Sequence, residues 1–220
     1  MGKNISIDEL KSLINENLDF SKKIKNYLHE NPELSSKEFE TRKFLIEECK
    51  KLGLETQEVN NSTGFVAIID TKRDGKILGL RTDIDALPIL ENDKNLKRKK
   101  EVVSKNSGVM HACGHDFHMA LALTSAKILS KLKERLDGKF YFIFEEGEET
   151  GSGIDDMVDH LKNVKFDAIY GNHVDTEIET GKIAISKGKV YAGCSGIDFD
   201  VIGKGGHGSR PDLLTSPINA

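Results

Sequence analysis

The first fifty residues carry apolar side chains at helical spacing in two stretches. The first stretch begins at a capping box, Ser6 with Glu9, and its apolar stripe continues toward Leu28. It predicts one helix that ends before the Asn31–Pro32 pair. The second stretch begins at another capping box, formed by Ser35 and Glu38, and predicts a second helix.

Shorter apolar stretches rich in β-branched and aromatic residues predict strands. They cover Glu55 to Val59, Phe65 to Asp70, Ile77 to Arg81, Lys139 to Phe144 and Phe166 to Tyr170. We expect the second and third strands to form a hairpin, and the last two to be buried. Helical patterns from His118 to Leu132 and from Ile154 to Leu161 alternate with the strands. This order predicts an α/β domain with a mixed, mostly parallel sheet flanked by helices.

The pattern changes after Gly181, where apolar and polar residues alternate in three short stretches. Strands are predicted over 182–186, 189–192 and 197–202. We therefore expect one domain over residues 1–190 and the start of a second domain over 191–220. About thirty residues are too few to bury a core alone.

Composition narrows the class of protein. The chain has 220 residues, of which 37% are hydrophobic and 31% charged, and a net charge of −4, which argues against a nucleic-acid partner. The basic run Lys94 to Lys100 lacks interleaved aromatic residues and is interpreted as a solvated loop. No apolar run has the length of a membrane helix, and no signal peptide is visible. Three cysteines without close pairing fit a reducing compartment, so a cytoplasmic protein is expected.

The stretch Met110 to His118 gathers three histidines, a thiol and a carboxylate around one glycine. Cys113 and His115 are two positions apart, and Gly114 between them lets both side chains turn to one side. A thiolate beside imidazoles suits zinc, and manganese, cobalt or nickel if carboxylates complete the ligand set. The alternative is a buried free cysteine beside surface histidines.

Polar side chains also follow the predicted strands. They lie in 81–85, in the acidic stretch 145–149, and at His173. The carboxyl ends of parallel strands form the ligand-binding edge of such a sheet, so we expect these loops to converge. Because adjacent carboxylates repel one another unless a cation neutralises them, the acidic stretch adds to the case for a metal.

Six ordered blocks resemble the metal-dependent amidohydrolases of the hippurate hydrolase, N-acyl-amino-acid and auxin-conjugate hydrolase type, in the metallopeptidase-20 family. The blocks are residues 28–34, 81–89, 108–116, 147–153, 171–174 and 203–208. The resemblance implies a zinc-peptidase-like catalytic domain over 1–190, into which an α+β lid or dimerisation domain is inserted from 191 onward.

The resemblance also implies roles for single residues. Four would be metal ligands for two divalent ions, Mn or Zn with Co or Ni as alternatives: Cys113, His115, Glu149 and His173. Glu148 would be the general base, and Asp85 would orient a ligand or tune that base, with Asp116 a weaker candidate for the same role. His207 would stabilise an oxyanion, often in the partner subunit of a homodimer.

The remaining histidines are not expected to bind metal. His118 is expected to begin a helix and to line the substrate cleft, while His111 is interpreted as a hydrogen-bonded core histidine. His29 and His160 lie on predicted helices and are interpreted as structural or exposed.

The predicted function is metal-dependent hydrolysis of the amide bond in N-acyl amino acids or short peptides. A dipeptidase or aminoacylase of the same family is one alternative. Members of this family run to nearly twice this length, and their last metal-binding histidine would lie beyond Ala220. A second alternative is therefore an inactive metal-binding fragment.

Overall fold

A computed structural model describes residues 4–94, 99–189 and 199–219. The chain divides into two compact units, residues 1–175 and 176–220, which are described separately. The domain boundary expected at 190/191 falls within the second unit, among residues outside those described, and stays a prediction.

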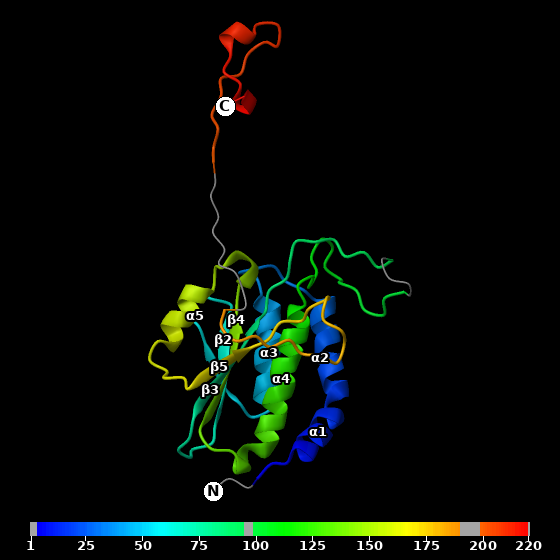
Figure 1. Cartoon of the computed structure of the whole chain (residues 1–220), viewed down its shortest axis with the longest axis vertical. Coiled ribbons are helices and arrows are strands. Elements are labelled where there is room, and N and C mark those ends of the chain that lie inside the picture. The colour runs from blue at the N-terminus through cyan, green and yellow to red at the C-terminus, as the bar shows by residue number, and fades with distance from the viewer. Residues whose placement is uncertain (1–3, 95–98, 190–198, 220) are drawn as a thin grey trace. The chain divides into compact units, whose positions relative to one another are not determined.

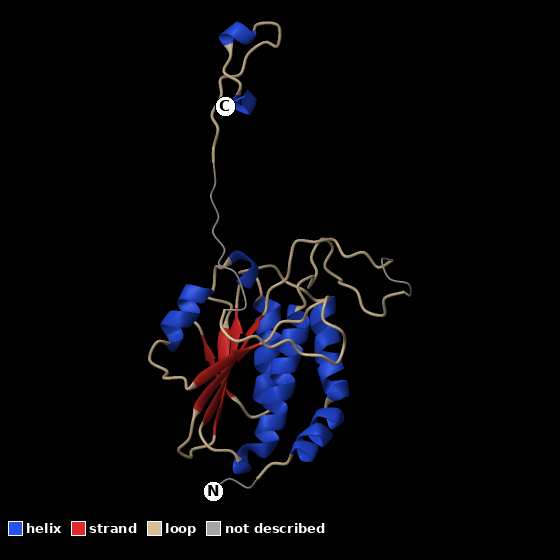
Figure 2. Cartoon of the chain, viewed as in Figure 1, coloured by secondary structure: helices blue, strands red, loops and turns tan. Residues whose placement is uncertain are grey.

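One mixed sheet forms the centre of the first unit (Figure 2). The described residues contribute five strands to it: β1 (Glu55–Glu58), β2 (Phe65–Asp70), β3 (Ile77–Asp83), β4 (Lys139–Glu145) and β5 (Ala168–Gly171). Their order is β1-β2-β4-β3-β5, with β1–β2 and β2–β4 antiparallel and both β3 pairings parallel. The mixed α/β architecture is confirmed, with two of these four pairings parallel.

The predicted hairpin between the second and third strands is wrong. β4 lies between β2 and β3, so these two strands do not pair. β2 and β4 carry apolar side chains on both faces, which is typical of strands at the centre of a sheet with helices on each side.

The described helices of this unit are α1 (Ile7–Glu16), α2 (Leu18–Glu30), α3 (Phe39–Lys51), α4 (His115–Leu132) and α5 (Ile154–Leu161). Ser6 caps α1 as expected, since its hydroxyl oxygen accepts the Glu9 backbone N–H at 3.1 Å. The single helix predicted toward Leu28 is instead two helices, because the chain breaks at Asn17, whose side-chain amide donates to the Leu13 carbonyl at 2.7 Å.

The capping box predicted for Ser35 and Glu38 does not form. Ser35 donates its hydroxyl proton to the Asp85 carboxylate, and the buried Glu38 accepts the backbone N–H of Gly147. Both residues therefore tie the start of α3 to loops beyond strand ends instead of capping the helix.

Alternate residues of β2 and β4 face two different layers. Phe65, Phe142 and Phe144 are among those that pack against α2, α3 and α4 on one face of the sheet (Figure 1). Val66 and Ile143 pack on the other face against Met157 of α5. The burial expected for the last strand is wrong, since β5 pairs only with β3 in the described sheet and all its residues are exposed.

The second unit is described as mostly irregular chain. It contains a bridge between Lys204 and Thr215 and short 3-10 turns at Pro211–Leu213 and Pro217–Asn219. The strand predicted over 182–186 does not form, and the described part of the one over 197–202 is irregular. Most of the strand predicted over 189–192 lies outside the described residues. None of the described helices is both long enough and apolar enough to span a bilayer.

Candidate metal centre

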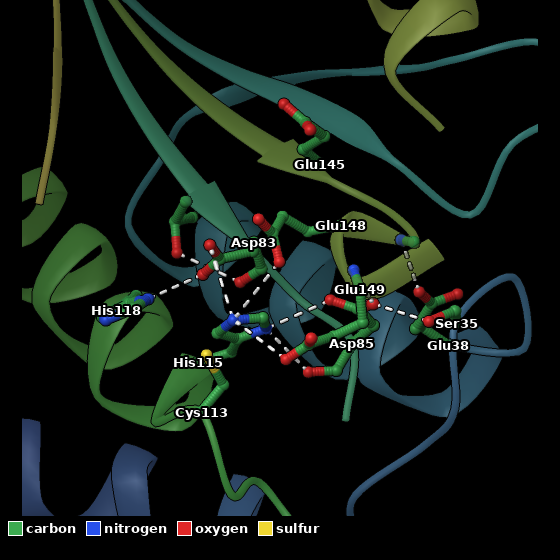
Figure 3. A network of polar contacts seen from close by, with 12 residues as sticks. Ser35, Glu38, Asp83, Asp85, Cys113, His115, His118, Glu145, Glu148 and Glu149 are labelled. Carbon is green, nitrogen blue, oxygen red and sulfur yellow. Dashed lines mark hydrogen bonds and ion pairs between the residues drawn. The ribbon is translucent and has the colours of Figure 1, made fainter. Parts of the chain in front are cut away.

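The carboxyl ends of β3 and β4 place acidic residues side by side. Asp83, the last residue of β3, pairs in register with Glu145, the last residue of β4. Arg81 joins the two carboxylates, with 2.8 Å to Asp83 and 2.9 Å to Glu145. The loops that follow bring Asp85, Glu148 and Glu149 to His115 (Figure 3). The expected convergence of these loops is confirmed.

Gly114 shapes the turn that presents Cys113 and His115. Its φ of +86° lies in the left-handed region that glycine adopts without strain, and His115 then begins α4. A Cβ atom at this position would lie 2.4 Å from Cγ2 of Val174. The glycine therefore allows the segment that carries His173 to approach the turn closely.

His115 has one ring nitrogen in use and one free. Nδ1 lies 3.0 Å from the Asp85 carbonyl oxygen and 3.1 Å from its carboxylate, so Nδ1 carries a proton and donates it. Nε2 is buried without a hydrogen-bond partner and faces carboxylate oxygens of Glu148 and Glu149, each at 3.8 Å. Burial alone would lower the pKa of His115, but the hydrogen bond to Asp85 and the charge of Asp83 outweigh it and raise the pKa.

Cys113 and His173 form a second contact, with 3.2 Å between Sγ and Nε2. Nδ1 of His173 donates to the Val174 carbonyl at 2.6 Å, which leaves Nε2 as the nitrogen that faces the sulfur. Burial and the negative charge of Glu149 raise the pKa of the Cys113 thiol to about 12. The acidic surroundings hold the thiol protonated unless a cation binds, and a coordinating cation would remove that proton.

These donor atoms fit divalent ions. Ligand atoms lie within 4.8 Å of one another in three groups of described residues: Cys113–His115–His173, His115–Glu148–Glu149 and Asp83–His115–His118. Two nitrogen or oxygen ligands on a tetrahedral zinc ion are about 3.4 Å apart. The bare Nε2 of His115 and the buried, unpartnered Oε1 of Glu149, 3.8 Å apart, are close to that spacing.

Only two of the four glutamates in 145–149, at the end of β4 and in the loop that follows, face His115. Glu145 pairs with Arg81, and Glu146 accepts the Thr63 hydroxyl at 2.8 Å. Glu148 is partly exposed, and burial together with the negative charge of Asp83 raises its pKa. A raised pKa suits a carboxylate that takes up and releases a proton near neutral pH.

Asp85 is fully buried and connects two of the expected ligands. One oxygen accepts from His115, and the other accepts the Ser35 hydroxyl at 2.7 Å and the Glu149 backbone N–H at 3.0 Å. Burial would raise the pKa of Asp85, but these hydrogen bonds outweigh it and lower the pKa. Asp116, the weaker candidate, instead accepts from His29 at 2.8 Å and is not in the three groups.

Sequence reasoning missed Asp83 and Ser35 as parts of this site. Asp83 accepts the Nδ1 proton of His118 at 2.7 Å. Burial would raise the pKa of Asp83, but this bond and the nearby positive charges lower it to about 2. The signal for Asp83 was its place at a strand end, whereas Ser35 was assigned to a helix cap and gave no signal.

The other histidines agree with expectation only in part. His118 uses both ring nitrogens, because Nε2 accepts the Val174 backbone N–H at 3.0 Å. His111 is a core histidine as expected, but the expected hydrogen bonds are wrong, since neither of its buried ring nitrogens has a partner among the described residues. Burial lowers the pKa of His111 to about 4, so its ring is neutral. His29 and His160 lie on helices α2 and α5 as expected. His207 lies in the second unit and contacts Ser209, and its expected role stays a prediction.

Comparison with known proteins extends these observations. The chain is 38% identical over 215 residues to thermostable carboxypeptidase 2 of Saccharolobus solfataricus, which covers 96% of the chain and 53% of that protein. It is 36% identical to hippurate hydrolase of Campylobacter jejuni, covering 95% of the chain and 54% of the relative. The chain thus spans about half the length of these curated relatives.

A solved structure agrees with the fold. A dinuclear metal binding peptidase from the M20 family of Bacillus subtilis superposes with a TM-score of 0.65 at 34% identity, covering 76% of this chain and 45% of that one. The family description "Peptidase family M20/M25/M40" matches residues 79–213. That stretch contains every residue expected to bind metal, and the chain belongs to this peptidase family.

Proposed function

We propose that the whole protein hydrolyses the amide bond of N-acyl amino acids with two divalent ions, Mn or Zn. The proposed ligands are Cys113, His115, Glu149 and His173. One observation carries the proposal: the bare Nε2 of His115 is buried without a partner and faces two carboxylates across a gap that suits a cation. Bound there, the ions would lower the pKa of water and polarise the amide carbonyl.

Residues of the chain would carry out proton transfer, orient a metal ligand and stabilise the oxyanion. Glu148 takes a proton from the attacking water and returns it to the departing amine, which leaves poorly without it. Its raised pKa and partial exposure support this role. Asp85 keeps His115 in the tautomer whose Nε2 is free. His207 is proposed to stabilise the oxyanion, as the family resemblance implies.

The substrate class rests on the names of relatives. Besides hippurate hydrolase, they include an N-acyl-L-amino acid amidohydrolase of Geobacillus stearothermophilus, 36% identical over 212 residues. The carboxypeptidase among the relatives favours peptides as a second candidate substrate class. Rates on N-acyl amino acids and on dipeptides with the same C-terminal residue separate the two. A cytoplasmic location and a homodimer are further parts of this proposal.

The two adjacent glutamates offer a matched test in the whole protein. Glu148→Gln should keep about two equivalents of metal and lower kcat by about 100-fold or more, as expected for loss of a general base. Glu149→Gln should instead lose metal. Metal content by elemental analysis and turnover of an N-acyl amino acid are measured together. A Glu148→Gln variant that keeps both its metal and its rate would show that Glu148 is not the base. In the 220-residue chain itself, one loosely held ion and no turnover would support the metal-binding fragment.

A further inference from the structure

His118 makes two hydrogen bonds that determine its protonation. The Val174 backbone N–H can only donate, so Nε2 of His118, 3.0 Å away, accepts and carries no proton. Nδ1 therefore carries the proton and donates it to Asp83 Oδ1 at 2.7 Å. The ring is buried on the first turn of α4, so neither bond is shared with solvent.

Asp83 is itself held firmly. Its second oxygen accepts a hydrogen bond from Arg81 at 2.8 Å, and Arg81 also donates two hydrogen bonds to the Glu145 carboxylate, at 2.9 and 3.1 Å. Since Asp83 and Glu145 are also paired in register on β3 and β4, Asp83 is fixed to the centre of the sheet. His118 is thus anchored at one nitrogen to the paired central strands of the first unit.

The other nitrogen of His118 holds the peptide unit that joins His173 to Val174. This segment follows β5 and has no regular secondary structure. The Val174 side chain lies against Gly114, where only a glycine leaves room for it. The rings of His118 and His173 lie edge to face, with their centroids 4.6 Å apart. One backbone hydrogen bond and two side-chain contacts therefore constrain where His173 lies.

We propose that Asp83 and His118 are positioning residues that hold His173 against Cys113 through the Val174 amide. The inference rests on the proposed function in taking His173 as a metal ligand. A histidine on an irregular segment would otherwise lose conformational entropy whenever it bound metal. The hydrogen bonds from the sheet remove much of that cost beforehand.

The test measures zinc affinity of the chain by competition with a chromophoric chelator. His118→Phe keeps a ring but loses both hydrogen bonds, whereas His118→Gln can still accept from Val174 and donate to Asp83. We expect His118→Phe to weaken zinc binding about 10- to 100-fold, and His118→Gln to restore most of it. With cobalt, the thiolate charge-transfer band of Cys113 should persist in both variants, because that ligand is untouched.

A double-mutant cycle with His173→Ala tests whether His118 affects zinc affinity through His173. Because His118 acts through His173, adding His118→Phe to His173→Ala should change affinity less than about 2-fold. Independent, additive effects, or wild-type affinity of His118→Phe, would overturn the positioning role alone. Unchanged affinity of His173→Ala would remove His173 from the proposed ligand set, and the positioning role with it.

Folding is checked by circular dichroism and urea unfolding without metal. If His118→Phe does not fold, Asp83→Asn replaces it in the cycle. The amide that this substitution introduces would donate to His118 Nδ1 and force the proton onto Nε2, where it would repel the Val174 N–H. Weakened zinc binding that is not additive with His173→Ala supports the proposal, and additive or absent weakening overturns it.

Discussion

Replacing Asp85 by asparagine should weaken metal binding more than it weakens the fold. Oδ2 of Asp85 accepts two hydrogen bonds, from Ser35 and from the Glu149 N–H, whereas Oδ1 accepts one, from His115. An asparagine therefore keeps its oxygen at the Oδ2 position and turns its NH₂ group toward Nδ1 of His115. Two donors then face each other, and only the Asp85 backbone carbonyl, 3.0 Å away, still accepts from Nδ1. The tautomer of His115 with its proton on Nε2 therefore becomes more populated than in the wild type, and that proton blocks the lone pair a metal would use.

The size of the effect follows from one misplaced donor. A single unsatisfied or misdirected hydrogen bond at a buried site costs about 1–3 kcal/mol. Changes behind a ligating histidine typically cost about 10- to 100-fold in metal affinity. We expect Asp85→Asn to weaken zinc binding by a similar factor, which corresponds to about 1.4–2.7 kcal/mol.

The assay is chelator competition at neutral pH, alongside urea unfolding of the metal-free chain. Asp116→Asn is the matched control, because Asp116 is also a buried carboxylate bonded to a histidine, His29, but lies outside the metal-ligating groups. The control should stay within about 2-fold of wild type in zinc affinity. Equal losses in both variants, or none in Asp85→Asn, would refute the tautomer argument.

Two further predictions concern neighbouring residues. The pKa of Asp83 is about 2, below its ordinary value of 3.8, because the His118 hydrogen bond and nearby positive charges outweigh burial. Between pH 2 and 3.8 the unfolded chain therefore binds more protons at this residue than the folded chain. The free energy of unfolding should fall as the pH drops from about 4 to 2, and Asp83→Asn should reduce that fall by about 2 kcal/mol. Urea titrations at several pH values measure this, and parallel curves for the variant and the wild type would contradict it. The Gly114→Ala substitution should lower both stability and zinc affinity, because the new Cβ atom meets Val174 at 2.4 Å. Gly53→Ala is the control, because Gly53 has a similar φ of +75° but no atom within 4 Å of its Cβ position, and this variant should lose stability alone. Chelator competition and urea unfolding check the pair, and equal zinc affinity in both variants would contradict the role of Gly114.

The fold was largely predictable from local patterns, and its errors have physical causes. The apolar stripe toward Leu28 continues across Asn17, so periodicity could not show that the Asn17 side chain turns back to the Leu13 carbonyl. The pairing of β4 between β2 and β3 depends on contacts between distant segments, which no local turn signal records. The apolar run in β5 predicted burial, yet β5 lies at the edge of the sheet that the described residues form, and Ile169 and Tyr170 are exposed.

The convergence of loops at the candidate site could be predicted from the sequence, but its hydrogen bonds could not. Residue types and the carboxyl ends of strands predicted that Cys113, His115, His173 and the acidic stretch 145–149 would meet. Only the family resemblance pointed to Glu149 within that stretch. The hydrogen-bond partners could not be predicted, because a serine three positions before a glutamate is also the pattern of a helix cap. Ser35 matches that pattern, but its hydroxyl serves a carboxylate fifty residues away.

The approach of Val174 to Gly114 also bears on how the protein acquires metal during folding. Before the sheet forms, Cys113 and His115 are the only pair of the proposed ligands that are near neighbours in sequence, so the unfolded chain offers a weak two-atom chelate. His173 arrives only when the segment after β5 closes onto the glycine, and Glu149 only when the loop after β4 reaches His115. Native zinc affinity should therefore develop late in refolding, in step with the last tertiary contacts and not with helix formation, so that metal uptake measures completion of the fold.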